Sequence, residues 1–328
     1  MTLRAFTLPL IAALSWTILV AARPRNEDKG YQMKTVGVIG LGDMGIGLAR
    51  NLLASGFSTL GYDLREERTA MLEESGGGRA ASCASLGQDC DAVFVMVLNG
   101  SQVQDAVLGQ GGLLEAMEPG KTVIVTATIL PAEVRALESP LTAKGVNLID
   151  TPVSGGKSGA DNGALTLMTA AKADVLTQNR DVLDAISKVV FHVGEEIGQG
   201  QTVKAALQAM IGCTFAATFE SLVMGHKAGV KGETLFNVIQ ASAVGSPLFE
   251  NCARLILDRK FENTGSHIGT MYKDLGITMS VAREAGASMF ATSAAYEMFQ
   301  AGISRFPDDD NWAIVKWLEE IAGTKVTW

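Results

Sequence analysis

The sequence predicts an α/β fold with a doubly wound parallel sheet, followed by an all-α C-terminal domain. From Thr35 to Gly194, short apolar runs alternate with helix-compatible segments, as in strands joined by helical crossovers. After Gly194 the strand-like runs stop, and helical periodicity continues to residue 328. With 328 residues, 47% of them apolar, the chain can bury the cores of roughly two domains. We therefore expect an extension at 1–32, the α/β domain at 33–194 and the helical domain at 195–328.

The predicted strands are short apolar runs bounded by polar or glycine-rich segments. They cover residues 35–39, 58–63, 92–97, 122–127, 146–150, 164–169 and 189–193. The segments between them that are compatible with helices include 44–55, 131–144 and 173–187. A parallel sheet built in this way is covered by helices on both faces. The glycine-rich run at 75–79 is typical of a loop.

One long helix is predicted over residues 200–229. Apolar residues recur there at spacings of three and four: Val203, Leu207, Met210, Ile211, Phe215, Phe219, Leu222 and Val223. We expect Val203 and Leu207 to turn toward the core. Phe215, Phe219, Met224 and Val230 add apolar surface on more than one side, which a lone domain would struggle to cover. The sequence therefore predicts a homo-oligomer through the helical domain, and it does not fix the number of subunits.

Composition and charge restrict the class of ligand. The net charge of −8 argues against a nucleic-acid surface, because nucleic-acid phosphates would meet an excess of carboxylates. The four cysteines have no paired metal spacing and are expected to be reduced, structural thiols, and the three histidines are scattered. The three aspartates at 308–310 are expected to cap a helix rather than to bind a metal. A small molecule is thus the expected ligand.

The N-terminal segment allows three interpretations. Residues 5–22 are apolar, with Arg4 before them and Arg23 after them, which is the pattern of a secretory signal or a short membrane anchor. Alternatively, translation starts at Met33, two residues before the first predicted strand, and residues 1–32 are an upstream extension. In that case we expect a cytoplasmic protein. A signal, organellar targeting or an anchor remains open.

The first predicted strand ends in a motif that is typical of a Rossmann-type dinucleotide site. Gly40, Gly42 and Gly45 follow the G-x-G-x-x-G pattern between a strand and a helix, with Leu41, Asp43 and Met44 between them. Asp63 ends the second strand, where its carboxylate can accept hydrogen bonds from ribose hydroxyls. It would also repel a 2′-phosphate, which favours NAD over NADP, although the nearby Arg65 keeps NADP as the alternative. A plain glycine-rich turn with Asp63 as a helix cap is the structural alternative.

Two further stretches could handle a substrate. Ser154, Gly155 and Gly156 form a turn after a strand, and its N–H groups and the Ser154 hydroxyl could bind a carboxylate. Lys204 and Gln208 are four positions apart and thus on one face of the long helix. From spacing alone, an ordinary turn and a solvated lysine are the competing interpretations.

These stretches resemble the β-hydroxyacid dehydrogenases, the group of 3-hydroxyisobutyrate dehydrogenase and tartronate semialdehyde reductase. Four motifs match in order: GLGDMGIGLARNL, DTPVSGGKSGA, GQGQTVKAALQ and YKDLGI. The resemblance implies that Gly40 to Gly45 bind the dinucleotide, Ser154 to Gly156 bind the substrate, and Lys204 is catalytic. It also implies that Lys273 lies beside the nicotinamide and the substrate. By the same alignment, Leu98 and Asn99 would lie against the cofactor, and Thr128 would offer its hydroxyl to the cofactor site. The resemblance also implies a dimer or a tetramer that assembles through the helical domain.

The chain departs from that family's pattern at three positions. Asn99 stands where the family usually has proline, and Ala127 stands where it usually has serine. Gln208 replaces an asparagine, which keeps the amide and moves it by one methylene. Together with LFEN at 248–251, KDLGI at 273–277 and the acidic segment from 307, this resembles the L-threonate dehydrogenase branch, which oxidises four-carbon sugar acids with NAD.

The implied reaction transfers a hydride between a small hydroxy acid and the nicotinamide. Lys204 would be the general base in oxidation and the general acid in reduction, with its pKa lowered by burial and by Lys273. Gln208 would hydrogen-bond the reacting or the neighbouring hydroxyl. Tartronate semialdehyde (2-hydroxy-3-oxopropionate) and 3-hydroxyisobutyrate are the alternative substrates. A non-catalytic dinucleotide-binding scaffold and an imine reductase are the alternatives of other classes.

Overall fold

The structure is a computed structural model that describes residues 34–328. The apolar segment 5–22, with its predicted signal or anchor, and the proposed start at Met33 lie outside the described residues.

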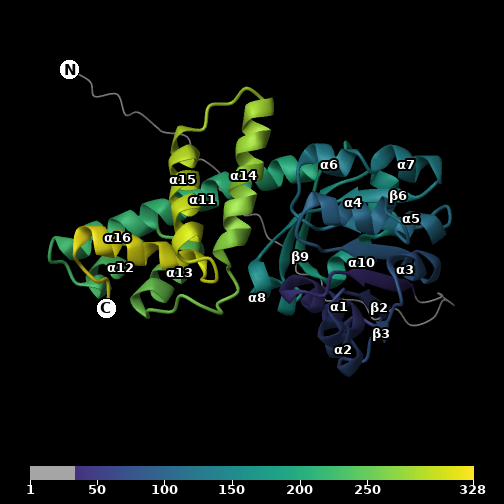
Figure 1. The fold of residues 1–328 in the computed structure, drawn as a ribbon, viewed down its shortest axis with the longest axis horizontal. Helices are drawn as coiled ribbons and strands as arrows, with labels where there is room; N and C mark the ends of the chain where they lie inside the picture. Colours follow the sequence, from purple (N-terminus) through teal and green to yellow (C-terminus); the bar gives the residue numbers. More distant parts are fainter. Residues whose placement is uncertain (1–33) are drawn as a thin grey trace, which may run out of the picture. The chain divides into compact units, whose positions relative to one another are not determined.

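A nine-stranded sheet forms the first part of the described chain (Figure 1). The strands run in the order β3-β2-β1-β4-β5-β6-β8-β7, and β9 pairs with β8. Their bounds are β1 Thr35–Ile39, β2 Ser58–Tyr62, β3 Gly78–Arg79, β4 Ala92–Val95, β5 Thr122–Val125, β6 Asn147–Asp150, β7 Val153–Ser154, β8 Leu165–Ala170 and β9 Ser187–Gly194. All pairs from β3 to β6 are parallel, which confirms the predicted doubly wound α/β fold.

The structure corrects two details of the predicted sheet. The strand β8 runs antiparallel to β6 and to β7, so the sheet is mixed at this end. The glycine-rich run at 75–79 is not all loop, because Gly78 and Arg79 pair with Leu60 and Gly61 as the short edge strand β3. This strand was missed because its two residues, Gly78 and Arg79, are too few to show an alternation of apolar and polar side chains.

Ten helices lie in this part of the chain, and they pack on the two faces of the sheet. Their bounds are α1 Asp43–Ala54, α2 Glu66–Glu74, α3 Cys83–Asp89, α4 Gly100–Leu108, α5 Leu113–Ala116, α6 Pro131–Arg135, α7 Glu138–Ala143, α8 Gly156–Asp161, α9 Ala173–Gln178 and α10 Arg180–Ala185. One buried core joins the sheet to α1, α8, α9 and α10, and a second joins it to α3 to α7. The prediction that helices cover both faces is confirmed.

Two helices that were predicted to be continuous are each broken in two. Pro140 has no N–H to donate to the carbonyl of Ala136, so the segment 131–144 forms α6 and α7. Asn179 separates α9 from α10, and its side chain donates to the carbonyl of Val175 at 2.9 Å and to the Thr122 hydroxyl at 3.1 Å. Such a side chain competes with the backbone for helical hydrogen bonds.

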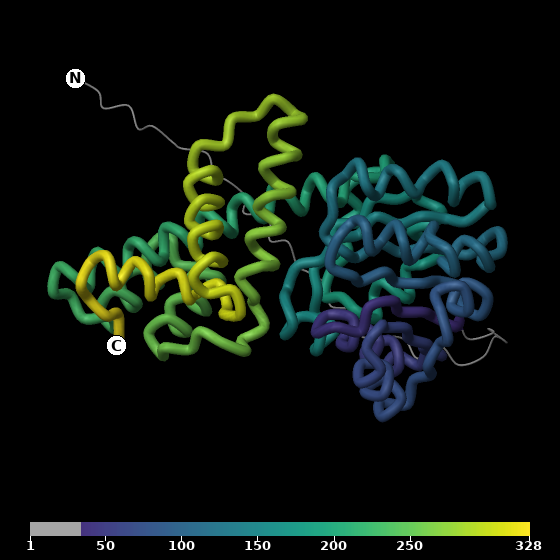
Figure 2. The backbone as a smooth tube through the Cα atoms, in the orientation of Figure 1, coloured from purple at the N-terminus to yellow at the C-terminus, as the bar shows by residue number. Residues whose placement is uncertain are grey.

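The second part of the described chain is helical, and α11 forms its centre. The elements are α11 Gln199–Lys227, α12 Gly232–Ala241, α13 Pro247–Leu257, α14 Ile268–Glu284, α15 Phe290–Arg305, the 3₁₀ helix η1 Asn311–Ala313, and α16 Ile314–Ala322. Figure 2 shows α14 and α15 side by side, and their residues share one apolar core with α11, α13 and α16. Among the described helices, α11 alone has the length and composition to cross a membrane. Its Phe219 and Leu222 are fully buried against the other helices, as in a core helix.

The faces of α11 differ from the prediction. Val203 was expected to face the core but is 39% exposed, whereas Lys204 and Gln208 are buried. Phe215 and Phe219 are covered within the chain, so they do not support the predicted oligomer. The spacing of apolar residues could not predict this arrangement, because the residues buried in the first turns of α11 include the polar Lys204 and Gln208.

The predicted helix cap at 308–310 is also wrong. Asp310 precedes η1 but does not cap it. Its carboxylate instead accepts hydrogen bonds from the Thr264 N–H and hydroxyl, both at 2.6 Å, and from the Ser266 N–H at 3.2 Å. Asp310 therefore fixes the loop that precedes α14.

Candidate active site

The residues that the sequence singled out gather where parallel strands end. Gly40 follows β1, Asp63 follows β2, Leu98 lies three residues after β4, and Thr128 lies three residues after β5. Asp150 is the last residue of β6. Because β2, β1, β4, β5 and β6 are parallel neighbours, these ends share one edge of the sheet. Ligands of doubly wound sheets bind at this edge.

The glycine turn has the shape that a dinucleotide needs. Gly40 has φ +84°, and its N–H donates to the Tyr62 carbonyl at 2.9 Å, which ties the turn to β2. A Cβ atom at Gly45 would lie 1.8 Å from the Gly40 oxygen, so a side chain is excluded there. At Gly42 the nearest atom to an added Cβ is the Arg65 Nη2, at 3.8 Å. The turn is thus closed at Gly40 and Gly45 but open to a ligand at Gly42.

The N-terminus of α1 opens directly from this turn. Gly42 is its N-cap residue, and no side chain caps the helix. The first N–H groups of an uncapped helix are free to bind an anion, which the helix dipole also favours. The residues present therefore fit a pyrophosphate.

Asp63, the residue after β2, fixes the glycine turn. Its Oδ2 accepts from the Leu41 N–H at 2.8 Å, and its Oδ1 accepts from the Arg65 N–H at 2.9 Å and from the Arg65 Nε at 3.2 Å. Burial alone would raise the pKa of Asp63, but these hydrogen bonds, led by that of the Arg65 side chain, lower it. Asp63 bonds neither the second nor the third N–H of α2, so it is not the helix cap of the alternative interpretation.

Two of the expected cofactor contacts have a structural task in the fold. Asn99 is the N-cap of α4, and its Oδ1 accepts from the Gln102 N–H at 2.9 Å. The side chain of Gln102 in turn accepts from the Leu98 N–H at 2.8 Å. The Leu98 side chain is exposed. Thr128, expected to offer its hydroxyl, uses its carbonyl oxygen to accept from the Lys273 Nζ at 2.6 Å.

Lys204 lies beside the Ser-Gly-Gly turn. Its side chain is only 6% exposed, and its Nζ donates to the carbonyl of Val153 at 2.9 Å. Val153 is followed by Ser154 in β7, and Gly155 precedes Gly156, the first residue of α8. The structure therefore brings the predicted base and the predicted carboxylate site together.

Burial governs the ionisation of Lys204. Loss of solvent lowers the pKa of its ammonium below the ordinary value, the Asp274 carboxylate opposes this change, and Lys273 adds to it. An amine with a lowered pKa is the form that a general base requires near neutral pH.

A polar network joins α11 to α14 one turn after Lys204. It consists of Gln208 on α11 and of Lys273 and Asp274 on α14. The Gln208 Nε2 lies 2.5 Å from the Asp274 Oδ2, and the Lys273 Nζ lies 2.9 Å from the Asp274 Oδ1. Gln208 and Asp274 are both buried. Lys273 therefore bridges a carboxylate of the helical part and, through Thr128, the end of β5.

Sequence reasoning missed a second buried network, made by Asp150 and Gln201. The Gln201 Nε2 donates to the Asp150 Oδ1 at 2.9 Å and to the Ala127 carbonyl at 3.0 Å, and its Oε1 accepts from the Ile129 N–H at 3.1 Å. The Asp150 Oδ2 accepts from the Gly198 N–H at 2.9 Å. Burial raises the pKa of Asp150 to about 6, against the lowering effect of these hydrogen bonds. The signal that could have revealed them is the position of each polar residue. Asp150 is the last residue of an apolar strand, and Gln201 lies in the first turn of the long helix.

Comparison with known proteins identifies the family. Residues 35–194 match the family described as the NAD binding domain of 6-phosphogluconate dehydrogenase. Residues 198–318 match the family described as NAD-binding of NADP-dependent 3-hydroxyisobutyrate dehydrogenase.

Named relatives cover nearly the same length. The chain is 37% identical to an L-threonate dehydrogenase of Cupriavidus necator, over 86% of this chain and 95% of that protein. It is 30% identical to a 2-(hydroxymethyl)glutarate dehydrogenase of Eubacterium barkeri, over 89% of this chain and 97% of that one. A crystal structure of a 3-hydroxyisobutyrate dehydrogenase from Salmonella typhimurium has a TM-score of 0.79 and 32% identity, covering 87% of this chain and 99% of that chain. The chain therefore belongs to the β-hydroxyacid dehydrogenases of the 3-hydroxyisobutyrate dehydrogenase group, the NAD(P)-dependent enzymes that act on CH–OH groups.

Proposed function

We propose that this enzyme oxidises a small sugar acid such as L-threonate with NAD, and that Lys204 is its general base. The observation that carries the proposal is the buried Lys204 amine, whose Nζ lies 2.9 Å from the carbonyl oxygen of the residue before Ser154. A substrate carboxylate bound by Ser154, Gly155 and Gly156 would hold its hydroxyl within reach of that amine.

Each residue of the site then has a task. Lys204 accepts the hydroxyl proton in oxidation and returns it in reduction. When bound, the nicotinamide supplies the acceptor for the hydride that leaves the same carbon. Lys273 keeps a positive charge beside the reacting groups and disfavours the charged form of Lys204. Gln208 and Asp274 close the site on the side of the helical domain.

L-threonate is preferred as the substrate for two reasons. The first is the identity of 37% to an L-threonate dehydrogenase. The second is Gln208, whose longer amide departs from the family's asparagine. A 2-(hydroxymethyl)glutarate, 3-hydroxyisobutyrate or tartronate semialdehyde substrate is the alternative within the same reaction class.

The choice of NAD is supported by Asp63. Its carboxylate lies at the end of β2, next to the open position at Gly42. A 2′-phosphate there would meet this negative charge, whereas two ribose hydroxyls could donate to it.

A panel of hydroxy acids tests the proposal. We expect purified enzyme to reduce NAD with L-threonate faster than with D-glycerate or 3-hydroxyisobutyrate, as followed by the absorbance of NADH. The Lys204→Met enzyme should show no such reduction above background. If no hydroxy acid reduces NAD or NADP with the wild-type enzyme, the proposal is wrong.

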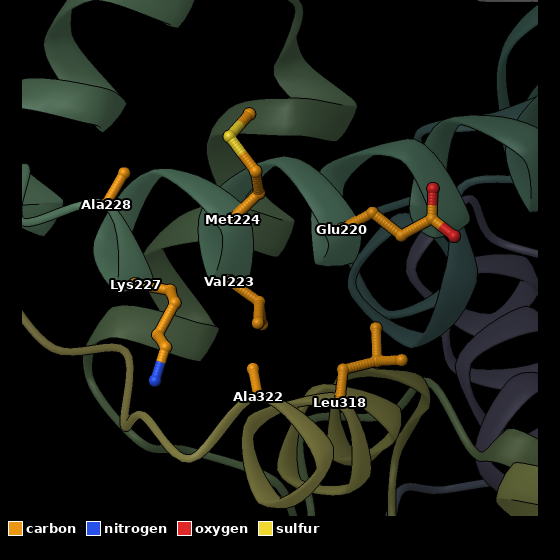
Figure 3. Close-up of a pocket in the computed structure, with 7 residues that line it drawn as sticks. All are labelled: Glu220, Val223, Met224, Lys227, Ala228, Leu318 and Ala322. Atoms are coloured by element: carbon orange, nitrogen blue, oxygen red, sulfur yellow. The ribbon is translucent and has the colours of Figure 1, made fainter.

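We further propose that the helical domain forms a homo-oligomer. Met210 and Met224 on α11 remain 69% and 67% exposed, and Ile321 on α16 remains 68% exposed. Met224 also borders a groove of about 400 Å³ between α11 and α16, where Val223 points toward Ala322 (Figure 3). This groove is not the catalytic site, since Glu220 lies about 24 Å along α11 from Lys204 at 1.5 Å per residue. Light scattering of wild-type and Met224→Lys protein tests the assembly.

A further inference from the structure

We infer that Asp274 holds the Gln208 side chain with its carbonyl oxygen toward the substrate. This oxygen would accept a hydrogen bond from a second hydroxyl of the substrate, on the carbon next to the one that is oxidised. The inference rests on the proposed function, because it assigns the substrate class of that same site. It makes Gln208 a specificity-determining residue and Asp274 its positioning residue.

The orientation of the Gln208 amide follows from its neighbours. Its nitrogen lies 2.5 Å from the Asp274 Oδ2 and 3.8 Å from the Met271 Sδ. Asp274 is paired with the Lys273 ammonium at 2.9 Å, so it is a carboxylate and can only accept hydrogen bonds. The reversed amide would set its oxygen against this carboxylate and lose both contacts. The two N–H bonds of Gln208 are therefore directed at Asp274 and Met271.

The Gln208 oxygen is the free end of the side chain. Within residues 34–328, no group donates a hydrogen bond to it, and it is not one of the fully buried oxygens that lack a partner. Gln208 is one helical turn after Lys204 on the same buried face of α11. A substrate held beside the Lys204 amine can thus reach an oxygen that only accepts.

The number of hydroxyl protons on the substrate determines which group can donate to Gln208. The reacting hydroxyl has one proton, and in oxidation that proton goes to Lys204. While that proton is shared with Lys204, it cannot also be donated to Gln208. The Gln208 oxygen must therefore accept a hydrogen bond from a different hydroxyl, on a neighbouring carbon, which keeps its proton. The enzyme should therefore prefer acids with two adjacent hydroxyls to acids with one. A neutral acceptor left without its donor in a buried site weakens kcat/KM by about tenfold to a hundredfold.

The test compares two classes of acid. L-Threonate and D-glycerate carry adjacent hydroxyls, whereas 3-hydroxyisobutyrate and 2-hydroxybutyrate carry one. We expect wild-type kcat/KM to be about tenfold to a hundredfold higher for the first class. In Gln208→Leu, kcat/KM should fall by a larger factor for the first class, so that the ratio approaches one. In Asp274→Asn, which lets the amide reverse, the ratio should fall part of the way, and Asp258→Asn on the surface should keep the wild-type ratio.

A second readout separates positioning from a loss of structure. Asp274 raises the pKa of Lys204, so Asp274→Asn should move the acid limb of the kcat/KM profile to lower pH. Gln208→Leu removes no charge and should leave this limb in place. If Asp274→Asn does not fold, the ratio in Gln208→Leu decides alone.

The outcomes distinguish this inference from the function on which it rests. A wild-type enzyme that oxidises hydroxy acids but shows no preference for adjacent hydroxyls overturns the inference and keeps the proposed function. An equal loss for both classes in Gln208→Leu also overturns it. A wild-type enzyme without activity on any of these acids overturns both.

Discussion

The Nζ of Lys204 donates to the carbonyl oxygen of Val153, 2.9 Å away, and this bond joins α11 to β7 at the start of the Ser-Gly-Gly turn. The proposed base and the proposed carboxylate site are therefore fixed relative to each other before a substrate binds. Pre-organised geometry of this kind lowers the entropic cost of reaching the transition state.

Replacing Lys204 by methionine should remove turnover and leave coenzyme binding nearly intact. The change deletes the proposed proton acceptor, and general bases contribute about 100- to 10,000-fold to rates. Kinetics of NAD reduction would measure the first effect, and NADH fluorescence titration the second. Lys188→Met, which removes an exposed lysine in β9, is the matched control and should behave as the wild type. Near-native turnover in Lys204→Met would exclude Lys204 as the base.

The pH dependence of oxidation should report the free amine of Lys204. Burial lowers its pKa below 10.5, so kcat/KM should rise with pH and reach half of its maximum below 10.5. The folded state also holds this proton less tightly than the unfolded state does. Stability should thus increase as pH rises from the folded pKa toward 10.5, and Lys204→Met should abolish this part of the increase. Paired kinetic and thermal-melting profiles check both statements.

Gln201 should matter for stability rather than for proton transfer. Gln201→Leu leaves the Ala127 carbonyl, the Ile129 N–H and the buried Asp150 carboxylate with fewer partners. We expect the free energy of unfolding to fall by about 2–4 kcal/mol, measured by urea denaturation. Gln178→Leu at an exposed position of α9 is the control, with a change within about 0.5 kcal/mol. A loss as small as the control's would mean that water replaces the Gln201 contacts.

Local patterns predicted the α/β part because each signal lies within a few residues. The apolar run before Gly40 and the glycine spacing after it are sufficient to identify the β1 turn. The breaks at Pro140 and Asn179 are also local, and they were missed because the apolar periodicity continues across them.

The buried polar networks could not be read in the same way. Gln201 meets Asp150 across 51 residues of sequence, and Gln208 meets Asp274 across 66. The first turns of α11 bury Lys204, whereas Val203 stays exposed, which inverts the usual relation between polarity and burial. A functional site is where such an inversion is expected, since its polar groups must be held away from bulk water.

Asp63 should determine the choice between NAD and NADP. In Asp63→Ser the repulsion of a 2′-phosphate is lost, and Arg65 is released from its ion pair with Asp63. We expect the ratio of kcat/KM for NAD to that for NADP to fall by at least about tenfold, which corresponds to about 1.4 kcal/mol. Part of this change should be a higher kcat/KM with NADP, because the freed Arg65 guanidinium would bind the 2′-phosphate. The double variant Asp63→Ser, Arg65→Ala should lose that increase. An unchanged ratio in Asp63→Ser would remove Asp63 from the cofactor site.

The glycine turn allows binding to be separated from folding. Gly42 has φ −62°, a value that alanine adopts freely, and its added Cβ meets only the Arg65 Nη2 at 3.8 Å. Gly42→Ala should therefore keep the wild-type melting temperature but weaken NADH binding by about tenfold or more, because the methyl group occupies the approach of the pyrophosphate. Gly45→Ala should lower both, since its Cβ would lie 1.8 Å from the Gly40 oxygen. Melting curves and fluorescence titrations of the two variants, side by side, decide this point. Equal NADH affinity in Gly42→Ala and the wild type would mean that the dinucleotide does not approach the chain at this turn.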